Sequence, residues 1–137
     1  MTIFGDGTQQ RAFSYIGDVA PVIARSIDVP EAYNTVFNVG ADVPYSVNQL
    51  AEVVAKCVGV ELKVNHLDPR DEVLHAFSSH QKAKRVFGCE ARVDLEEGIS
   101  RMAQWAKKVG VRRSKPFQNI EILKNLPKIW LQDLKSA

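Results

Sequence analysis

The chain has 137 residues, a net charge of +2 and an apolar fraction of 45%, which are ordinary values for one soluble globular domain. So small a charge, spread along the chain, argues against nucleic acid as a partner. No apolar run approaches the roughly 20 residues that span a bilayer, and residues 1–6 lack the features of a secretory signal. Cys57 and Cys89 have no metal-ligand spacing, so we expect a cytoplasmic chain with reduced thiols.

The N-terminal residues alternate between strand and turn patterns. Thr2–Phe4 predicts the end of a strand, and the glycines of Gly5–Gly7 allow the positive φ angles of a turn. Ala12–Tyr15 alternates small and aromatic side chains, which is typical of a short strand. A helix follows at about Val19–Ser26, with Asp18 predicted as its N-cap because a carboxylate can accept the unpaired N–H groups there.

The middle of the chain predicts a buried strand, a well-bounded helix and a further strand. Thr35–Val39 reads TVFNV, and its β-branched and aromatic residues predict a buried strand. Ser46 and Gln49 have the spacing of a capping box, for a helix that ends at Gly59. Glu61–His66 then alternates apolar and polar residues, as a strand does.

Two more helices are predicted after these elements. Ser78 and Gln81 have capping-box spacing just before the helical pattern of Lys82–Phe87. Asp94 and Glu97 repeat that spacing before a helix that continues to the next terminating glycine. Helices alternating with short strands indicate the α/β class, in which several helices pack on a small mixed sheet.

The patterns divide the chain into two parts. Residues 1–110 hold all the predicted elements and are expected to form one domain. Residues 111–137 are irregular and basic, and we expect a C-terminal extension or docking tail. The apolar residues of this tail are Phe117, Ile120, Ile122, Leu126, Ile129 and Trp130.

Motifs for cofactor binding and catalysis are absent from the sequence. No G-x-G-x-x-G motif follows a strand, and Gly5 and Gly7 lead into a strand-like segment instead of a phosphate-binding helix. None of the three tyrosines begins a Tyr-x-x-x-Lys motif. His66, His75 and His80 lack zinc-site spacing, so we expect exposed or half-buried polar residues. The chain alone therefore predicts no complete catalytic apparatus.

Three stretches, taken as an ordered set, resemble one enzyme family. They read TIFGDGTQQRAFSYIGDVA, VFNVGADVPYSVNQLAEVVAKCVG and DPRDEVLHAFSSHQKAKRVFGCEARVDLEEGISRMAQWAKK, and together cover residues 2 to about 109. They are similar to the C-terminal, substrate-binding domain of the extended short-chain dehydrogenase/reductases, which include NAD-dependent nucleotide-sugar epimerases, dehydratases and decarboxylases. The family's N-terminal Rossmann half, with its NAD-binding turn and catalytic tyrosine and lysine, has no counterpart in this chain.

The resemblance implies phosphate-binding roles for two arginines. Arg11 lies between the glycine turn and an aromatic segment, where the family has an arginine that holds the diphosphate of its substrate. A guanidinium suits that role because it can bond two phosphate oxygens at once and never loses its charge. Arg70, on a loop after a predicted strand, resembles the family's second phosphate arginine. The alternative for both is a solvated surface arginine.

The resemblance also implies contacts with the nucleoside. Ile3 and Phe4 would offer apolar surface to a pyrimidine base, and Phe13 would lie near the diphosphate and ribose, with core packing as the alternative for all three. The family's R-x-G-D motif is one residue shorter here, so either Asp71 or Glu72 could accept the ribose hydroxyls. The alternative for these two is a solvated carboxylate.

The implied function is to bind a nucleotide-sugar, and a UDP-hexose 4-epimerase is the simplest parent enzyme. This chain would hold the diphosphate and position the sugar for C4 oxidation by NAD on a separate cofactor domain, binding no cofactor itself. A dehydratase or decarboxylase stays open as the parent. The alternative is a non-catalytic truncated module that acts through oligomerisation or protein interaction, because a domain face without its cover exposes apolar surface.

Overall fold

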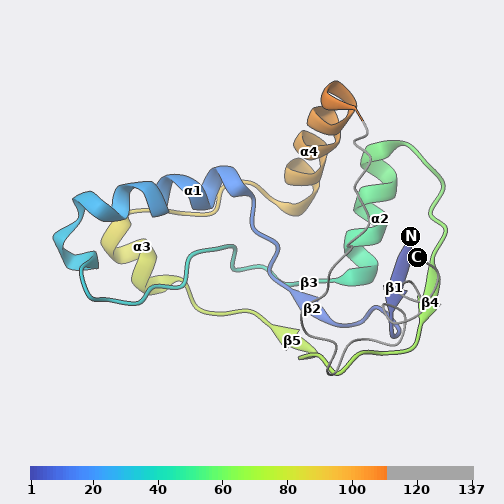
Figure 1. The fold of residues 1–137 in the computed structure, drawn as a ribbon, viewed down its shortest axis with the longest axis horizontal. Coiled ribbons are helices and arrows are strands. Elements are labelled where there is room, and N and C mark those ends of the chain that lie inside the picture. The colour runs from blue at the N-terminus through green and yellow to red at the C-terminus, as the bar shows by residue number, and fades with distance from the viewer. Residues whose placement is uncertain (111–137) are drawn as a thin grey trace, which may run out of the picture.

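A computed structural model describes residues 1–110, and the predicted tail at 111–137 lies outside the described residues. Four helices lie within the described range: α1 (Ile16–Arg25), α2 (Val47–Val58), α3 (Gln81–Phe87) and α4 (Leu95–Val109). Figure 1 shows them in two groups, with α2 and α4 standing side by side near the strands and α1 lying alongside α3 at the far end of the molecule.

The strands within residues 1–110 are short: β1 (Thr2–Phe4), β2 (Gln10–Arg11), β3 (Tyr45–Ser46), β4 (Asn65–Leu67) and β5 (His75–Ala76). β1 pairs in parallel with β4, and β2 lies between antiparallel β3 and parallel β5. This arrangement confirms the predicted α/β class with a small mixed sheet. It also places residues from the start of the chain beside segments that follow much later.

Helix α2 forms as its local sequence predicts. The Ser46 hydroxyl accepts from the backbone N–H of Gln49, whose side chain accepts from the backbone N–H of Ser46 in return, which is a complete capping box. Gly59 ends the helix in the left-handed conformation, at φ 81°. The small buried residues Ala51 and Ala55 let α4 approach closely, and Lys56 Nζ bonds Glu96 Oε1 at 2.6 Å across the two helices.

The second group of helices has a small apolar core. Val22 on α1 and Ala83 and Phe87 on α3 are buried there. The Phe37 ring meets the Phe87 ring edge to face, with centroids 5.0 Å apart. Two short 3₁₀ helices, η1 (Ser26–Asp28) and η2 (Pro30–Ala32), lead from α1 back toward this core.

The predicted strand at Ala12–Tyr15 is wrong, because β2 occupies Gln10–Arg11 instead. The strands on both sides of β2 are equally short, so the ladder ends before Ala12. The strand predicted at Glu61–His66 begins later than expected, at Asn65.

The predicted buried strand at Thr35–Val39 is also absent. No strand within residues 1–110 lies beside it, and Val36 is 84% exposed. Phe37 and Val39 nevertheless pack on the core of the second group. The segment therefore has the composition of a strand, but no neighbouring strand within residues 1–110 pairs with it.

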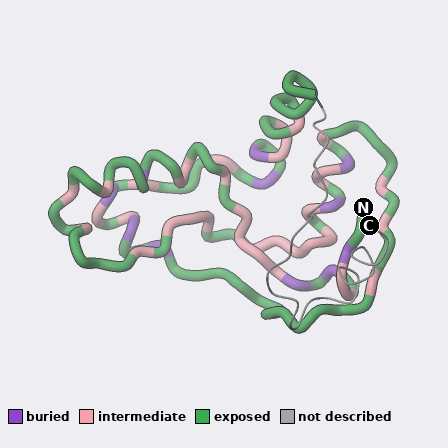
Figure 2. The backbone as a smooth tube through the Cα atoms, viewed as in Figure 1, coloured by how far each residue is buried: buried purple, intermediate pink, exposed green. Residues whose placement is uncertain are grey.

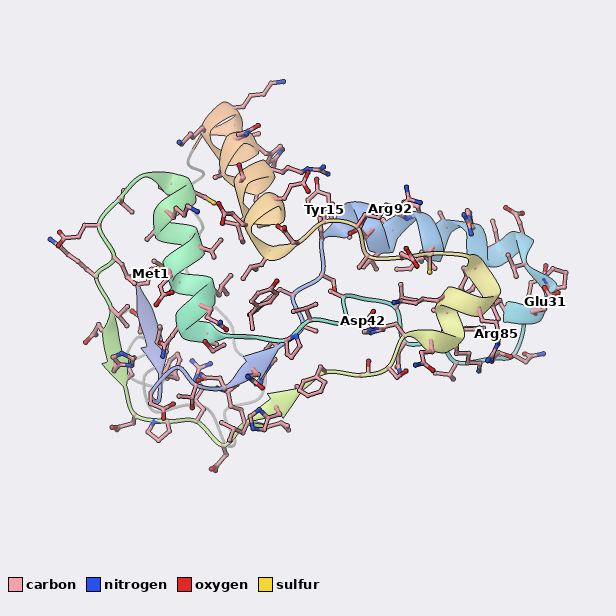
Figure 3. The ribbon with its side chains drawn as sticks, turned by 180° about the vertical axis from the view of Figure 1, so that it is seen from behind. Met1, Tyr15, Glu31, Asp42, Arg85 and Arg92 are labelled. Carbon is pink, nitrogen blue, oxygen red and sulfur yellow. The ribbon has the colours of Figure 1, made fainter. Side chains whose placement is uncertain are left out.

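Asp18 does not cap α1, which begins two residues before it, at Ile16. Its carboxylate instead accepts from the backbone N–H groups of Arg92 and Val93, at 3.1 and 3.0 Å, and so ties the first turn of α1 to the segment before α4. Figure 3 shows Arg92 beside the start of α1. A carboxylate satisfies distant backbone donors as well as those of its own helix.

The two other predicted capping boxes form in part or not at all. Ser78 does not cap α3, since the N-cap is His80 and the Ser78 hydroxyl lies 3.2 Å from His80 Nε2. His80 is itself buried, contrary to the prediction of an exposed or half-buried histidine. Asp94 caps α4 by accepting from the backbone N–H of Glu97, while the Glu97 side chain pairs with Arg101.

Much of the chain is exposed, as Figure 2 shows, and many large apolar side chains are among the exposed residues. Large side chains that face outward include Ile23 on α1, Ile27 on η1, and Met102 and Trp105 on α4. Among residues 1–110, no helix has both the length and the apolar character needed to cross a membrane.

Asp42 links the extended segment before β3 to helix α3, and Figure 3 shows it facing that helix. Its carboxylate lies 2.6 Å from Lys84 Nζ and 2.8 Å from His80 Nδ1. The hydrogen bond from Lys84, followed by that from His80, holds the pKa of Asp42 below its ordinary value of 3.8.

We expect Asp42→Asn to lower the free energy of unfolding at neutral pH. A carboxyl whose pKa is lowered by folding stabilises the protein above the unfolded-state pKa, and that contribution is lost as the pH falls through the folded-state pKa. The difference between wild type and variant should therefore shrink below about pH 3.8. Urea unfolding across this pH range measures it, with Asp28→Asn on η1 as a control; a difference that does not change with pH would contradict the assignment.

Candidate functional site

An open cavity of about 740 Å³ lies where the parallel strands β1 and β4 both end. Ligands in α/β proteins commonly bind at the carboxyl ends of parallel strands, because the loops leaving those ends surround a crevice. The lining residues come from the end of β1 and the segment between β1 and β2, from β4 and from the loop leading to β5: Phe4, Gly5, Asp6, Gln9, His66, Leu67, Asp68, Pro69, Arg70, Glu72 and Leu74.

Glycine is required in the turn after β1. Gly5 and Gly7 have φ angles of 72° and 78°, which only glycine adopts without strain. A Cβ on Gly7 would lie 2.0 Å from the side-chain oxygen of Asn48. The Asn48 amide in turn donates to the backbone carbonyl of Asp6 at 2.9 Å, so the start of α2 fixes one wall of the cavity.

Arg11, on β2, is not part of the cavity lining, but its guanidinium bonds two residues that are, Glu72 and Leu74. Its Nη1 donates to the carbonyls of Gln10 and Leu74, at 2.7 and 3.3 Å, and its Nη2 pairs with Glu72 Oε2 at 2.9 Å. The side chain is 27% exposed, so it reaches solvent from a fixed position. These bonds leave Nε and one hydrogen of Nη2 without a recorded partner within residues 1–110, and both could donate to a ligand.

Arg70 lies across the ring of Phe4 on the cavity wall. Its guanidinium carbon is 3.3 Å from the ring centroid, which is a close cation–π stack. The arginine therefore covers one face of the aromatic ring. A base that stacked on Phe4 would have to use the other face or displace Arg70.

Gln9 is a site residue that the sequence interpretation did not single out. It is one of two buried polar or charged residues among residues 1–110, and its amide nitrogen donates to the Phe4 carbonyl at 2.9 Å and to Glu72 Oε1 at 3.3 Å. Gln9 precedes Arg11 by two residues, and both side chains bond the same carboxylate. The sequence offered one signal for Gln9: residues two apart in an extended segment point to the same side, so Gln9 could be expected to lie on the side of Arg11.

The structure brings some of the predicted site residues together and leaves others apart. Phe4, Arg70 and Glu72 line the cavity, and Arg11 joins them through Glu72. The remaining predicted site residues, Ile3, Phe13 and Asp71, are not part of its lining. Ile3 is buried at 3% exposure, Phe13 is half-buried and Asp71 is exposed.

The cavity carries both signs of charge. Asp6, Asp68 and Glu72 are acidic, while Arg70 supplies a positive charge within the lining and Arg11, outside the lining, supplies a second beside Glu72. Hydrogen bonds from the backbone N–H and the hydroxyl of Thr8 lower the pKa of Asp6, which stays ionised near neutral pH. A bound anion would therefore lie toward the arginines and away from the glycine turn.

The site is equipped for binding and positioning. Within residues 1–110, no group of three or more His, Cys, Asp or Glu side chains is placed to hold a metal ion. His66 Nδ1 lies 2.7 Å from the carbonyl of Gly5, so this ring orders the turn. Fixed guanidinium groups, an aromatic face and a carboxylate can together recognise a ligand that has an anionic group, a flat ring and hydroxyl groups.

Comparison with known sequences shows that this chain is similar to UDP-sugar epimerases. No family model matches the chain. It is 32% identical over 125 residues to UDP-glucuronate 4-epimerase of Thermodesulfobacterium geofontis, a match that covers 90% of this chain and 35% of the relative. The chain thus spans about a third of the length of the relatives that it matches.

Solved structures give the same result. UDP-glucose 4-epimerase of Thermotoga maritima with UDP-glucose superposes with a TM-score of 0.73 at 30% identity, over 79% of this chain and 35% of that one. UDP-glucuronic acid 4-epimerase of Bacillus cereus, in complex with UDP-glucuronic acid and NAD, gives 0.72 at 25% identity, over 80% and 35%. Over about a third of their length, the chain is therefore similar to the C-terminal part of UDP-glucuronate and UDP-glucose 4-epimerases and of NAD-dependent epimerases and dehydratases.

Proposed function

We propose that this chain is the nucleotide-sugar-binding part of an NAD-dependent sugar epimerase or dehydratase, with a UDP-sugar as its ligand. One observation carries the proposal: Arg70 and Glu72 line one open cavity beyond the ends of two parallel strands, and Glu72 is paired with Arg11. The Bacillus cereus relative, which holds UDP-glucuronic acid, has the same fold over the matched region.

Each part of the ligand has a proposed partner at the cavity. The diphosphate would bond the unused donors of Arg11 and the guanidinium of Arg70, because both groups keep their charge at any physiological pH. The uracil would stack on Phe4 when Arg70 turns from the ring to the phosphates. Glu72, which lines the cavity, is a better candidate than Asp71 for accepting the ribose hydroxyls.

In this proposal the chemistry belongs to a domain that the chain does not contain. NAD on that domain would accept and return the hydride at the sugar C4, while the residues described above hold the nucleotide so that the sugar reaches it. The favoured parent is a UDP-sugar 4-epimerase, with dehydratases and decarboxylases as the other candidates. Cys57 and Cys89 are free thiols, which fits the proposed cytoplasmic location.

The first prediction concerns the two arginines. Arg11→Ala should weaken UDP binding by about 1.5–3 kcal/mol, the range for hydrogen bonds to charged groups, and Arg70→Ala should behave similarly. Arg11→Lys should recover only part of the loss, because an ammonium keeps the charge but cannot bond two oxygens in a fork. Isothermal titration with UDP measures each effect.

Uridine separates a phosphate contact from a structural one. Uridine binding should be nearly unaffected by either substitution, since uridine has no phosphate. Arg85→Ala on α3, distant in sequence from the cavity lining, is the matched control. Equal losses for UDP and uridine would mean that the arginines only hold the cavity together.

The second prediction is that the chain alone neither binds NAD nor interconverts UDP-glucose and UDP-galactose. Its sequence contains neither the glycine fingerprint nor Tyr-x-x-x-Lys. Titration with NAD should give no saturable isotherm, and product analysis should find no turnover. Saturable NAD binding or turnover by the purified chain would refute the proposal that the chemistry lies elsewhere.

The second candidate function is a non-catalytic module that acts by self-association. The uncovered side chains of Met102 and Trp105 on α4 favour it, because exposed apolar surface promotes association. Light scattering should then report particles that grow with concentration. Association without any heat from UDP would support this candidate over the first, whereas a monomer at high concentration would exclude it.

A further inference from the structure

A serine, a histidine and an aspartate lie in a chain of hydrogen-bond contacts at the start of helix α3. Ser78 Oγ is 3.2 Å from His80 Nε2, and His80 Nδ1 is 2.8 Å from Asp42 Oδ1. None of the three side chains lines the cavity at the strand ends, so the proposed nucleotide site does not use them. A hydroxyl, an imidazole and a carboxylate in this order form the arrangement that activates a serine as a nucleophile.

The imidazole of His80 is held in one position and one tautomer. Its side chain is 8% exposed, and the ring is fixed by the contact with Asp42. Lys84 Nζ donates to the other oxygen of that carboxylate at 2.6 Å, and the hydrogen bonds from Lys84 and His80 lower the pKa of Asp42, which is ionised at neutral pH. An ionised carboxylate only accepts hydrogen bonds, so His80 Nδ1 carries the proton and Nε2 keeps its lone pair. The Ser78 hydroxyl therefore donates to a nitrogen that can act as a base.

There is room for reactants beside these groups. Ser78 is exposed, so a small molecule can reach its hydroxyl from solvent. A Cβ on Gly40 would lie 3.3 Å from His80 Nε2, and the glycine keeps that side of the ring open. A cavity of about 20 Å³, lined in part by Gly40, His80 and Lys84, is large enough for one water molecule. An acyl group can thus approach the serine while water has access to the histidine.

We propose that Ser78 is a nucleophile that hydrolyses carboxylic esters, with His80 as its general base and Asp42 as the residue that positions His80. In the first step Ser78 Oγ bonds the carbonyl carbon, its proton passes to His80 Nε2, and the ester C–O bond breaks as the alcohol leaves with that proton. In the second step His80 takes a proton from water, the water oxygen bonds the acyl carbon, and the acid leaves as Ser78 Oγ recovers its proton. Aryl esters are the favoured class, because a phenolate leaves with the least help from the protein.

The test uses the full 137-residue chain and two defined probes. Release of p-nitrophenolate from p-nitrophenyl acetate measures turnover, and mass spectrometry after treatment with a fluorophosphonate, which forms a stable adduct with activated serines, locates the nucleophile. We expect turnover and an adduct on Ser78. Ser78→Ala should abolish both, whereas Ser79→Ala, which removes the adjacent exposed hydroxyl, should change neither.

Two further substitutions test the base and its positioning residue. His80→Ala should slow turnover at least about 100-fold, the lower end of the range for general-base catalysis. Imidazole added to this variant should restore part of the rate, which loss of a purely structural side chain would not allow. Asp42→Asn should also slow turnover, and Asp42→Glu should recover part of the loss because it restores the carboxylate.

Three results would overturn the proposal. Turnover that is equal in wild type and Ser78→Ala would place the reaction on another group. Labelling of Ser78 that is absent, or that is as fast in urea as in the folded chain, would mean that the fold does not activate this hydroxyl. Turnover that is unchanged in His80→Ala would remove the base. If His80→Ala does not fold, the comparison of wild type with Ser78→Ala and with the urea-unfolded chain still decides the question.

Discussion

The candidate site depends on the carboxylate of Glu72, which links the segments that form it. It accepts from Arg11 on β2 and from the buried amide of Gln9, and Gln9 also bonds the carbonyl at the end of β1. One exposed loop residue thus joins the first strand, the second strand and the loop before β5. The negative charge of Glu72 beside Arg11 also weakens the attraction of this arginine for a ligand anion.

Sequence patterns correctly predicted the elements that are stabilised by interactions between residues close together in the sequence. The α2 helix was correct at both ends because Ser46, Gln49 and Gly59 satisfy the helix termini within a few residues. Thr35–Val39 was not a strand because strand formation needs a neighbour, and composition cannot supply one. Asp18 has the chemistry of an N-cap, but the donors that it satisfies lie on a segment more than seventy residues later. Such distant pairings cannot be derived from spacing.

For the site, too, the sequence predicted what depends on local pattern and missed what depends on contacts between distant segments. Arg11 and Arg70 were selected by their place in a family pattern; Arg70 lines the cavity, whereas Arg11 is outside the lining and bonds Glu72, which is part of it. That Arg70 stacks on Phe4, or that Gln9 is buried beneath Glu72, depends on the fold and has no signature in the local sequence. That Glu72 lines the cavity and the adjacent Asp71 does not depends on the loop conformation, which the local sequence does not specify.

The parallel pairing of β1 with β4 has a consequence for how the chain folds. Thr2 meets Asn65 only after the whole intervening chain, including α1 and α2, has been gathered into a closed loop. The entropy of closing that loop is lost before the pairing stabilises anything, whereas α2 can form from its own neighbours. We therefore expect the helices to form early and the strand ends that frame the cavity to form late. The cavity is therefore expected to form after the folding nucleus, once the rest of the fold is in place.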